Sequence, residues 1–350
     1  MSPEEQKPII NRRVENRIGK MVLLSNEIRD RQDSYERTDA LVLAKLIAIT
    51  SLPLKRTQDR DRSKIFRLGQ ELWTKITLTT AAGQELPFGE DRFVLAGIMH
   101  LAVQGESPIV FFKHACELLK MFEVSTNKQG YRLLRERFKR ISGLSITIQY
   151  ATSEEELGDR AIGENMFVIH KYALPTRKEI EEEKSGQMPL KGVLDNPDLN
   201  NSPYGVKLGG EFWDYLKNPK NQLIIPINLL KLFIDRPTGW DYALFLHSRC
   251  GSAKTSSVID HETLMKLFKE GSEPDRNTVA RLQKYHKEIM LVTDKRLNAN
   301  LIEDSSHPQE GRGRKKKRWK LCVGPSEKIV WSGKKPCLSF IGNDLKNCKS

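Results

Sequence analysis

Hydrophobic positions late in the chain recur every three to four residues and then every second residue. The first spacing predicts a helix over residues 276–290, and the second predicts strands over 297–303 and 319–323. The apolar side of the helix consists of Val279, Leu282, His286 and Ile289. Helix, strand, charged loop and strand follow one another as the recognition helix and wing of a winged helix-turn-helix do.

The same order of elements is predicted twice. Helices over residues 92–103, 107–122 and 127–141 precede strands over 144–150 and 166–172, with Asp91 placed to cap the first helix. Helices over 238–249, 262–270 and 276–290 precede the second pair of strands. We therefore predict an α+β fold that is mainly helical and contains tandem winged helix-turn-helix domains.

Composition shifts divide the chain into five segments. Residues 174–203 hold four prolines and a run of three glutamates, which is typical of a linker. The predicted segments are a charged helical region over 1–50, a first winged-helix domain over 51–173, the linker over 174–203, a second, DNA-binding domain over 204–324 and a basic tail over 325–350.

Positive charge gathers in the C-terminal part. The net charge is +13, and residues 271–350 hold 18 Lys or Arg against 9 Asp or Glu, so +9 of it lies there. Such a concentration indicates a polyanionic partner. We expect nucleic acid rather than an anionic membrane, because no strongly amphipathic basic helix with large exposed apolar residues is evident. No apolar run spans a bilayer and residues 1–11 lack an apolar signal core, so we expect a cytoplasmic protein.

The polar side of helix 276–290 supplies candidate DNA-reading residues. Asn277, Arg281, Lys284 and Glu288 are predicted to point away from the apolar side. Arg and Lys match guanine edges and Asn matches adenine edges in the major groove. The wing tip has the densest charge and is the candidate for phosphate contact. The DNA-binding candidates of this domain are Asn277, Arg281, Lys284, Lys287, Arg312, Arg314, Lys315, Lys316, Lys317 and Arg318.

A second basic stripe lies on the predicted helix 127–141. Tyr131, Leu134, Phe138 and Ile141 form its apolar side, and Lys128, Arg132, Arg135 and Lys139 form a stripe about 100° round the helix. This stripe either contacts phosphates and guanines or is an ordinary solvated face. The loop that follows carries Glu154, Glu155, Glu156 and Asp159, which phosphates would repel.

Signatures of catalysis and metal binding are not evident in the sequence. The five cysteines form no CxxC pair, and the seven histidines form no HxH or HExxH pair. Residues 251–255 contain Lys-Thr without the glycine spacing of a phosphate loop and are predicted to be a loop between helices. We predict no enzyme activity, cofactor or metal, and expect His286 to pack locally.

Short motifs in a fixed order resemble the plasmid-encoded RepA replication initiators. The resemblance spans about residues 50–290 and does not include a catalytic signature. The motifs are Leu52-Pro53-Leu54-Lys55-Arg56, Leu86-Pro87-Phe88-Gly89, Gly130-Tyr131-Arg132-Leu133-Leu134-Arg135-Glu136, Phe212-Trp213-Asp214-Tyr215-Leu216 and Arg236-Pro237-Thr238-Gly239-Trp240.

The resemblance implies two winged-helix domains that bind repeated double-stranded sites at a plasmid origin. It further implies recruitment of host initiator and helicase-loading proteins in the bacterial cytoplasm. Related initiators also form dimers on an operator of their own gene, so a homodimer made through the first domain is expected. Two alternatives remain at this point, a winged-helix transcriptional repressor and, less favoured, a strand-nicking initiator enzyme.

Overall fold

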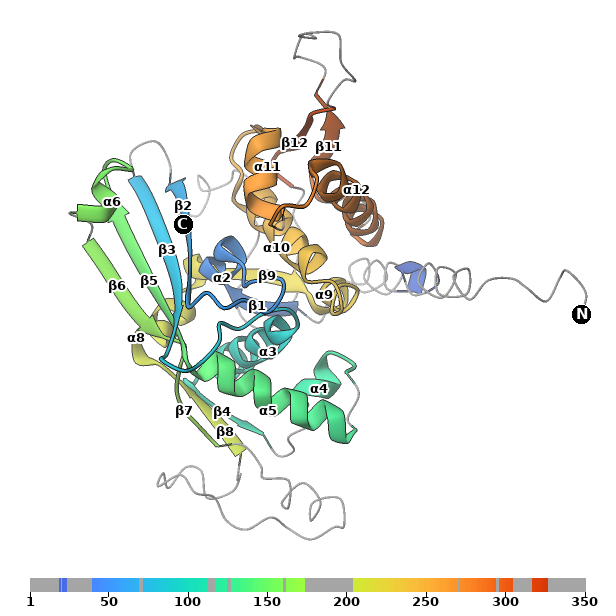
Figure 1. Cartoon of the computed structure of the whole chain (residues 1–350). Helices are drawn as coiled ribbons and strands as arrows, with labels where there is room; N and C mark the ends of the chain where they lie inside the picture. Colours follow the sequence, from blue (N-terminus) through green and yellow to red (C-terminus); the bar gives the residue numbers. More distant parts are fainter. Residues whose placement is uncertain are drawn as a thin grey trace, which may run out of the picture. The chain divides into compact units, whose positions relative to one another are not determined.

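The computed structural model describes residues 19, 21–23, 40–68, 72–112, 117–124, 127–159, 162–173, 204–269, 271–293, 296–304 and 317–326. The chain forms two compact units (Figure 1). The first unit comprises Leu41–Ile224 and Ile234–Pro237, and the second comprises Met1–Ala40, Ile225–Phe233 and Thr238–Ser350. The predicted linker over 174–203 lies outside the described residues.

The first unit is a mixed α+β structure that contains two antiparallel sheets. Its larger sheet has the strand order β2-β3-β5-β6, and its smaller sheet has the order β4-β8-β7. Strand β1 pairs with β9, which brings the two ends of the unit together. The strands are β1 Ala40–Ala44, β2 Asp61–Leu68, β3 Leu72–Thr80, β4 Ile109–Phe112, β5 Leu144–Ala151, β6 Ile162–Phe167, β7 Ile169–Ala173, β8 Tyr204–Leu208 and β9 Gln222–Pro226.

The helices of the first unit pack their apolar residues against one another and against the sheets. Their bounds are α2 Lys45–Thr50, α3 Asp91–Gln104, α4 Glu117–Met121, α5 Lys128–Ser142, α6 Glu156–Asp159, α8 Gly210–Lys217 and the 3-10 turn η3 Pro219–Asn221. On α5, Leu134, Phe138 and Ile141 are buried, as their spacing predicts. Helix α3 buries residues all round, including Phe93, which contacts Phe122 at 5.3 Å between ring centroids.

The predicted helix over 107–122 is wrong. Residues Ile109–Phe112 form strand β4, which pairs with β8 in the register Val110↔Val206, and the described helix after it is α4 at Glu117–Met121. β-branched and aromatic side chains suit a strand when a partner is available. That partner is almost a hundred residues away in the sequence, so local spacing did not reveal it.

The predicted strand over 166–172 is divided in two. Strand β6 ends at Phe167 and pairs with β5, whereas β7 begins at Ile169 and pairs with β8 in the other sheet. Between them the backbone of Val168 donates to Leu144 and accepts from Gly209. Because β8, α8 and the first three residues of β9 belong to the first unit, this unit extends to Ile224, beyond the predicted domain boundary at residue 204.

A buried ion pair joins α5 to the start of α3. The Asp91 carboxylate is 1% exposed and accepts hydrogen bonds from Arg140 Nε at 2.7 Å and Nη2 at 2.8 Å. Arg137 pairs with Glu90 and lies 3.7 Å from Asp91 Oδ1. Asp91 also accepts from the backbone of Phe88 at 2.9 Å. Asp91 is therefore the first residue of α3 and an ion-pair partner, and the helix cap is Glu90.

Arg92 connects two of the motifs noted in the sequence. Its buried guanidinium donates to the carbonyls of Leu52, Pro53 and Gly89. Gly89 donates its own N–H to Pro53 at 3.0 Å and has φ +53°, a conformation that favours glycine. Hydrogen bonds therefore join the segments 52–56 and 86–89 to each other and to the start of α3.

The second unit combines helices with one three-stranded antiparallel sheet. After α9 (Ile227–Lys231), its elements are α10 Pro237–Ser252, β10 Ser257–Ile259, α11 His261–Phe268, α12 Asp275–Val292, β11 Ala299–Glu303 and β12 Trp319–Val323. Pro237, the first residue of α10, belongs to the first unit. The three predicted helices and both predicted strands are confirmed. Strand β10, which completes a sheet of order β10-β12-β11, follows the predicted loop and was not predicted.

Aromatic contacts hold the helices of the second unit together. Phe268 of α11 contacts Tyr242 and Phe245 of α10 at 5.3 and 5.4 Å between ring centroids. Phe233 contacts Tyr285 of α12 at 5.5 Å. A Cβ on Gly239 would lie 2.3 Å from the Phe233 ring, so the glycine of the 236–240 motif permits this close approach.

Replacing Asp91 with Asn should destabilise the first unit by about 3–5 kcal/mol, because the arginines would remain buried without their counter-charge. Urea unfolding followed by circular dichroism measures the change. Asp214→Asn is the matched control, since its pair with Lys217 is exposed and its loss should cost at most about 1 kcal/mol. Equal effects of the two substitutions would contradict a structural role for the Asp91 pair.

Lowering the pH should destabilise the second unit through His247. This side chain of α10 is buried, and burial lowers its pKa to about 3. Because the unfolded-state pKa is higher, at about 6.5, the unfolded chain gains the proton first and stability is lost as pH falls below that value. From pH 6.5 to 4.5 the loss from His247 should be about 2–3 kcal/mol.

His247→Leu should remove this part of the pH dependence in unfolding titrations. An unaltered pH dependence in His247→Leu would refute the assignment.

Candidate nucleic-acid interface

The turn between α11 and α12 is specified by local sequence. Asp260 caps α11 by accepting from the backbone N–H of Thr263 at 2.7 Å, and this hydrogen bond lowers the Asp260 pKa. Pro274 stands at the N-cap of α12, where its restricted φ suits the chain entering a helix. Asp275 in the first turn of α12 pairs with Lys269 at 2.7 Å.

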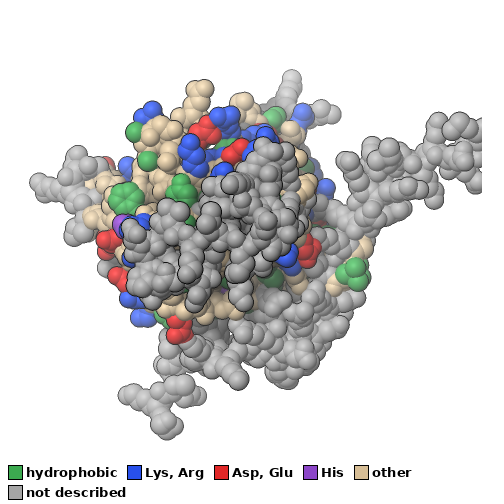
Figure 2. Space-filling view, turned by 90° about the horizontal axis from the view of Figure 1, so that it is seen from below, with side chains coloured by type: hydrophobic (Ala, Val, Ile, Leu, Met, Phe, Trp, Pro, Cys, Tyr) green, Lys and Arg blue, Asp and Glu red, His purple; other side chains and the backbone are tan. Residues whose placement is uncertain are grey.

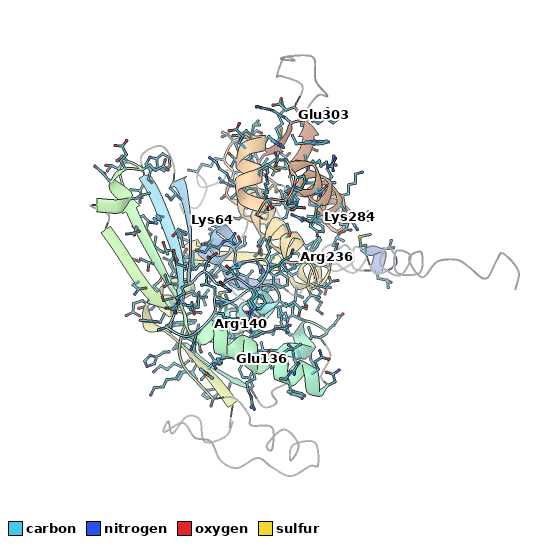
Figure 3. All side chains as sticks on the ribbon, viewed as in Figure 1. Lys64, Glu136, Arg140, Arg236, Lys284 and Glu303 are labelled. Carbon is cyan, nitrogen blue, oxygen red and sulfur yellow. The ribbon has the colours of Figure 1, made fainter. Side chains whose placement is uncertain are left out.

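One side of α12 is buried in the core and the opposite side is exposed. The buried side contains Val279, Leu282, Tyr285, Ile289 and Val292. The exposed side contains Arg276, Asn277, Ala280, Lys284, Lys287 and Leu291. Figure 3 labels Lys284 on this helix. The exposed residues follow a helical spacing, and we call them the α12 stripe.

The structure tests the predicted placement of three residues of α12. Glu288 is 7% exposed and does not point outward, which corrects the prediction. Arg281 is only partly exposed, because its guanidinium pairs with Glu273 in the turn before α12. His286 packs locally, as predicted, with Nδ1 3.0 Å from the Tyr242 hydroxyl, and burial lowers its pKa.

Two of the predicted wing-tip residues lie just before β12. Lys317 is exposed and pairs with Glu303 of β11 at 2.9 Å, and Arg318 is also exposed. The backbone of Arg318 accepts from Asp304 at 2.9 Å, which closes the described base of the hairpin. Arg312, Arg314, Lys315 and Lys316 lie outside the described residues.

Helix α5 of the first unit presents the predicted basic stripe outward. Arg132, Arg135 and Lys139 are exposed, whereas the side chain of Lys128 lies outside the described residues. Arg137 and Arg140 turn inward to the acidic residues at the start of α3, and their guanidinium carbons lie 4.7 and 4.6 Å from the rings of Phe93 and Phe88. Burial lowers the pKa of Arg137.

The acidic loop after β5 is partly used for local structure. Glu156 accepts from the hydroxyl and the backbone N–H of Thr152, and these bonds lower its pKa. Glu154 and Glu155 are exposed. The side chain of Asp159, at the end of α6, lies outside the described residues.

Exposed basic residues in the structure are often balanced by acidic neighbours. In the space-filling view, Lys and Arg side chains lie among Asp and Glu side chains (Figure 2). Arg132, for example, lies 3.9 Å from Glu136 on α5. The α12 stripe contains three cations and no acid, which distinguishes it as a candidate surface for an anionic ligand.

Arg276 and Ala280 were not among the predicted site residues. Their positions precede Lys284 by eight and four residues, so helical periodicity alone could have placed them on the same side. Ala280 adds no bulk between the longer polar side chains, and a helix with a small residue at the centre of its exposed side can approach a groove floor closely.

The described residues show neither a metal cluster nor a membrane span. Across the described ranges, no group of three or more His, Cys, Asp or Glu side chains is placed to hold a metal ion. None of the helices in that part of the chain is both long and apolar enough to cross a bilayer.

Comparison with known proteins reveals a shared fold. No family model and no curated protein matches the sequence. A crystal structure of a selenomethionine derivative of domains 2 and 3 of RctB matches with a TM-score of 0.50 and 12% identity, covering 80% of this chain and 98% of that one. A crystal structure of RctB domains 2–3, residues 155–483, has a TM-score of 0.49 and 13% identity, covering 80% and 97%. The chain thus has a mixed α+β fold similar to that of these RctB domains.

Replacing Lys284 and Lys287 with Gln should weaken binding to duplex DNA of any sequence. If each lysine contacts one phosphate, the slope of log affinity against log salt should become less steep by about 0.9 per lysine. Fluorescence anisotropy over a salt series measures this slope. The double variant Lys171→Gln/Lys207→Gln, which removes the same two charges from exposed positions on β7 and β8, should leave the slope unchanged.

Proposed function

We propose that this chain is a replication initiator that binds double-stranded DNA and does not itself catalyse a reaction. The observation that carries the proposal is the α12 stripe, a row of basic and amide side chains on the exposed side of a helix in a winged helix-turn-helix arrangement. The core residues on the opposite side hold the helix in place. Such a helix fits the major groove, which is about 12 Å wide.

The α12 stripe has the chemistry to read bases as well as to hold phosphates. Asn277 matches the adenine edge, and Arg276 near the helix N-terminus matches the guanine edge. Lys284 and Lys287 supply positive charge farther along the helix. Strands β11 and β12 belong to this unit's sheet, and the chain between them carries the basic segment 312–318, which we propose contacts the phosphate backbone.

The initiator role rests on the resemblance of the sequence motifs to plasmid RepA initiators. The structure supports that resemblance by joining two of the motifs, since Arg92 donates hydrogen bonds to backbone carbonyls of both the 52–56 and the 86–89 segments. The fold shared with domains 2 and 3 of RctB is consistent with tandem winged-helix domains. We infer that the targets are repeated sites at a plasmid origin.

The first unit is proposed to serve partners and neighbouring DNA. The exposed Arg132, Arg135 and Lys139 of α5 would contact phosphates of the bound DNA. Its acidic loop would favour protein contacts over DNA contacts, which suits a unit that forms a homodimer or recruits host initiator and helicase-loading proteins. A dimer could also repress the chain's own gene.

A footprint of the purified protein on DNA next to its own gene tests the proposal. We expect protection of direct repeats, and loss of the plasmid from dividing cells when the gene is deleted. Protection without a replication defect would instead indicate a repressor. Supercoiled origin DNA incubated with the protein and Mg²⁺ should remain unnicked, and a nick covalently attached to protein would indicate an enzyme.

A further inference from the structure

A single carboxylate closes the turn that leads into α12. Glu273 accepts from Arg281 Nη1 at 3.0 Å through one oxygen and from Nη2 at 2.9 Å through the other. The second oxygen also lies 3.2 Å from the Thr278 hydroxyl. Arg281 Nη2 in turn lies 3.4 Å from the carbonyl of Phe268, the last residue of α11. One group of contacts therefore joins α11, the turn and α12.

The environment of these contacts makes them stronger than an ordinary surface pair. The side chains of Glu273 and Arg281 are 19% and 24% exposed, and Thr278 is fully buried. A two-bond carboxylate–guanidinium pair is directional as well as strong. The pair should therefore resist rotation of α12 about the turn, which would carry the α12 stripe out of register with a groove.

The same geometry occupies the side chain that the sequence predicts as a base reader. The guanidinium of Arg281 is bound on its Nη1 and Nη2 edge by Glu273, the edge that would form paired bonds to guanine. The exposed positions of α12 lie to one side of it, at Asn277, Ala280 and Lys284. Arg281 is thus held between the turn and the stripe.

We propose that Glu273 and Arg281 are positioning residues that set the angle of α12 for DNA, and that Arg281 does not read bases. The proposal rests on the DNA-binding function proposed above and assigns the reading to the α12 stripe. It reverses the role that the residue type of Arg281 suggests.

The direction in which Glu273→Gln changes the affinity for DNA separates positioning from electrostatics. Glu273→Gln removes a negative charge from a DNA-binding unit, so long-range attraction alone would strengthen binding. Loss of the positioning pair instead weakens it. Glu262→Gln is the matched control, because Glu262 is exposed on α11 and its replacement changes the net charge equally.

The experiment uses the full-length chain and two duplexes of equal length. One is the duplex that the wild type enriches from a pool with a randomised core, and the other is its scrambled version. We expect Glu273→Gln to bind the selected duplex about tenfold more weakly, within the range of coupling between contacting residues. Glu262→Gln should bind at least as well as the wild type. Circular dichroism and thermal unfolding confirm that each variant is folded at the assay temperature.

Two further variants separate positioning from a loss of fold and from base reading. Arg281→Gln should weaken binding to a similar degree, and the Glu273→Gln/Arg281→Gln double variant should be no weaker than the weaker single one. The reversed pair Glu273→Arg/Arg281→Glu should recover part of the affinity.

Each outcome bears on a different claim. Enrichment of no duplex by the wild type would overturn the proposed function together with this inference. DNA binding by the wild type with equal affinity of Glu273→Gln and Glu262→Gln would overturn the inference alone. The inference would also be overturned if Arg281→Gln relaxed discrimination at a single base pair while Glu273→Gln left both discrimination and affinity intact.

Discussion

The carboxylate of Asp91 is the group on which the first unit most depends. An ionised carboxylate away from water is costly unless opposite charge and hydrogen bonds surround it. Arg140 supplies two hydrogen bonds, Arg137 lies within 3.7 Å, and the backbone of Phe88 donates a further bond. These contacts fix α5 on α3. Arg92, the next residue of α3, in turn donates to the carbonyls of Pro53 and Gly89 and so joins α3 to the segments around them. With two of its arginines drawn inward, α5 leaves Arg132, Arg135 and Lys139 on its exposed side.

In the second unit, another carboxylate–guanidinium pair anchors a helix. Glu273 and Arg281 are bound to each other at the turn before α12, while aromatic contacts of Tyr242, Phe245 and Phe268 hold α10 against α11. In both units an arginine on the helix that carries the exposed basic stripe is used to anchor that helix. A charged residue on such a helix therefore cannot be assigned to a ligand from its type alone, because anchoring and recognition favour the same guanidinium chemistry.

Much of the second unit was predictable because its signals are local. Three helices over 238–249, 262–270 and 276–290 and strands over 297–303 and 319–323 were predicted from periodicities of about 3.6 and 2, and the structure contains all five elements. Strand β10 was missed because its three residues gain their partner only from β12, more than sixty residues later. Strand β4 was mistaken for helix for the same reason, and the extent of the first unit was underestimated because β8 pairs back across the predicted linker with β7 and β4.

The sequence by itself determined the three helices α10, α11 and α12 of the second unit, where the positive charge gathers, and that α12 has one apolar and one polar side. Those properties depend on residues within a few turns of one another. Only the tertiary structure decided which polar residues of a helix remain available. Glu288 is buried, Arg281 is bound by Glu273, and Arg137 and Arg140 are bound at the start of α3, whereas Lys284 and Lys287 are exposed. The physical reason is that a long charged side chain reaches partners far away in the sequence, and the energy of pairing it depends on where those partners lie in space.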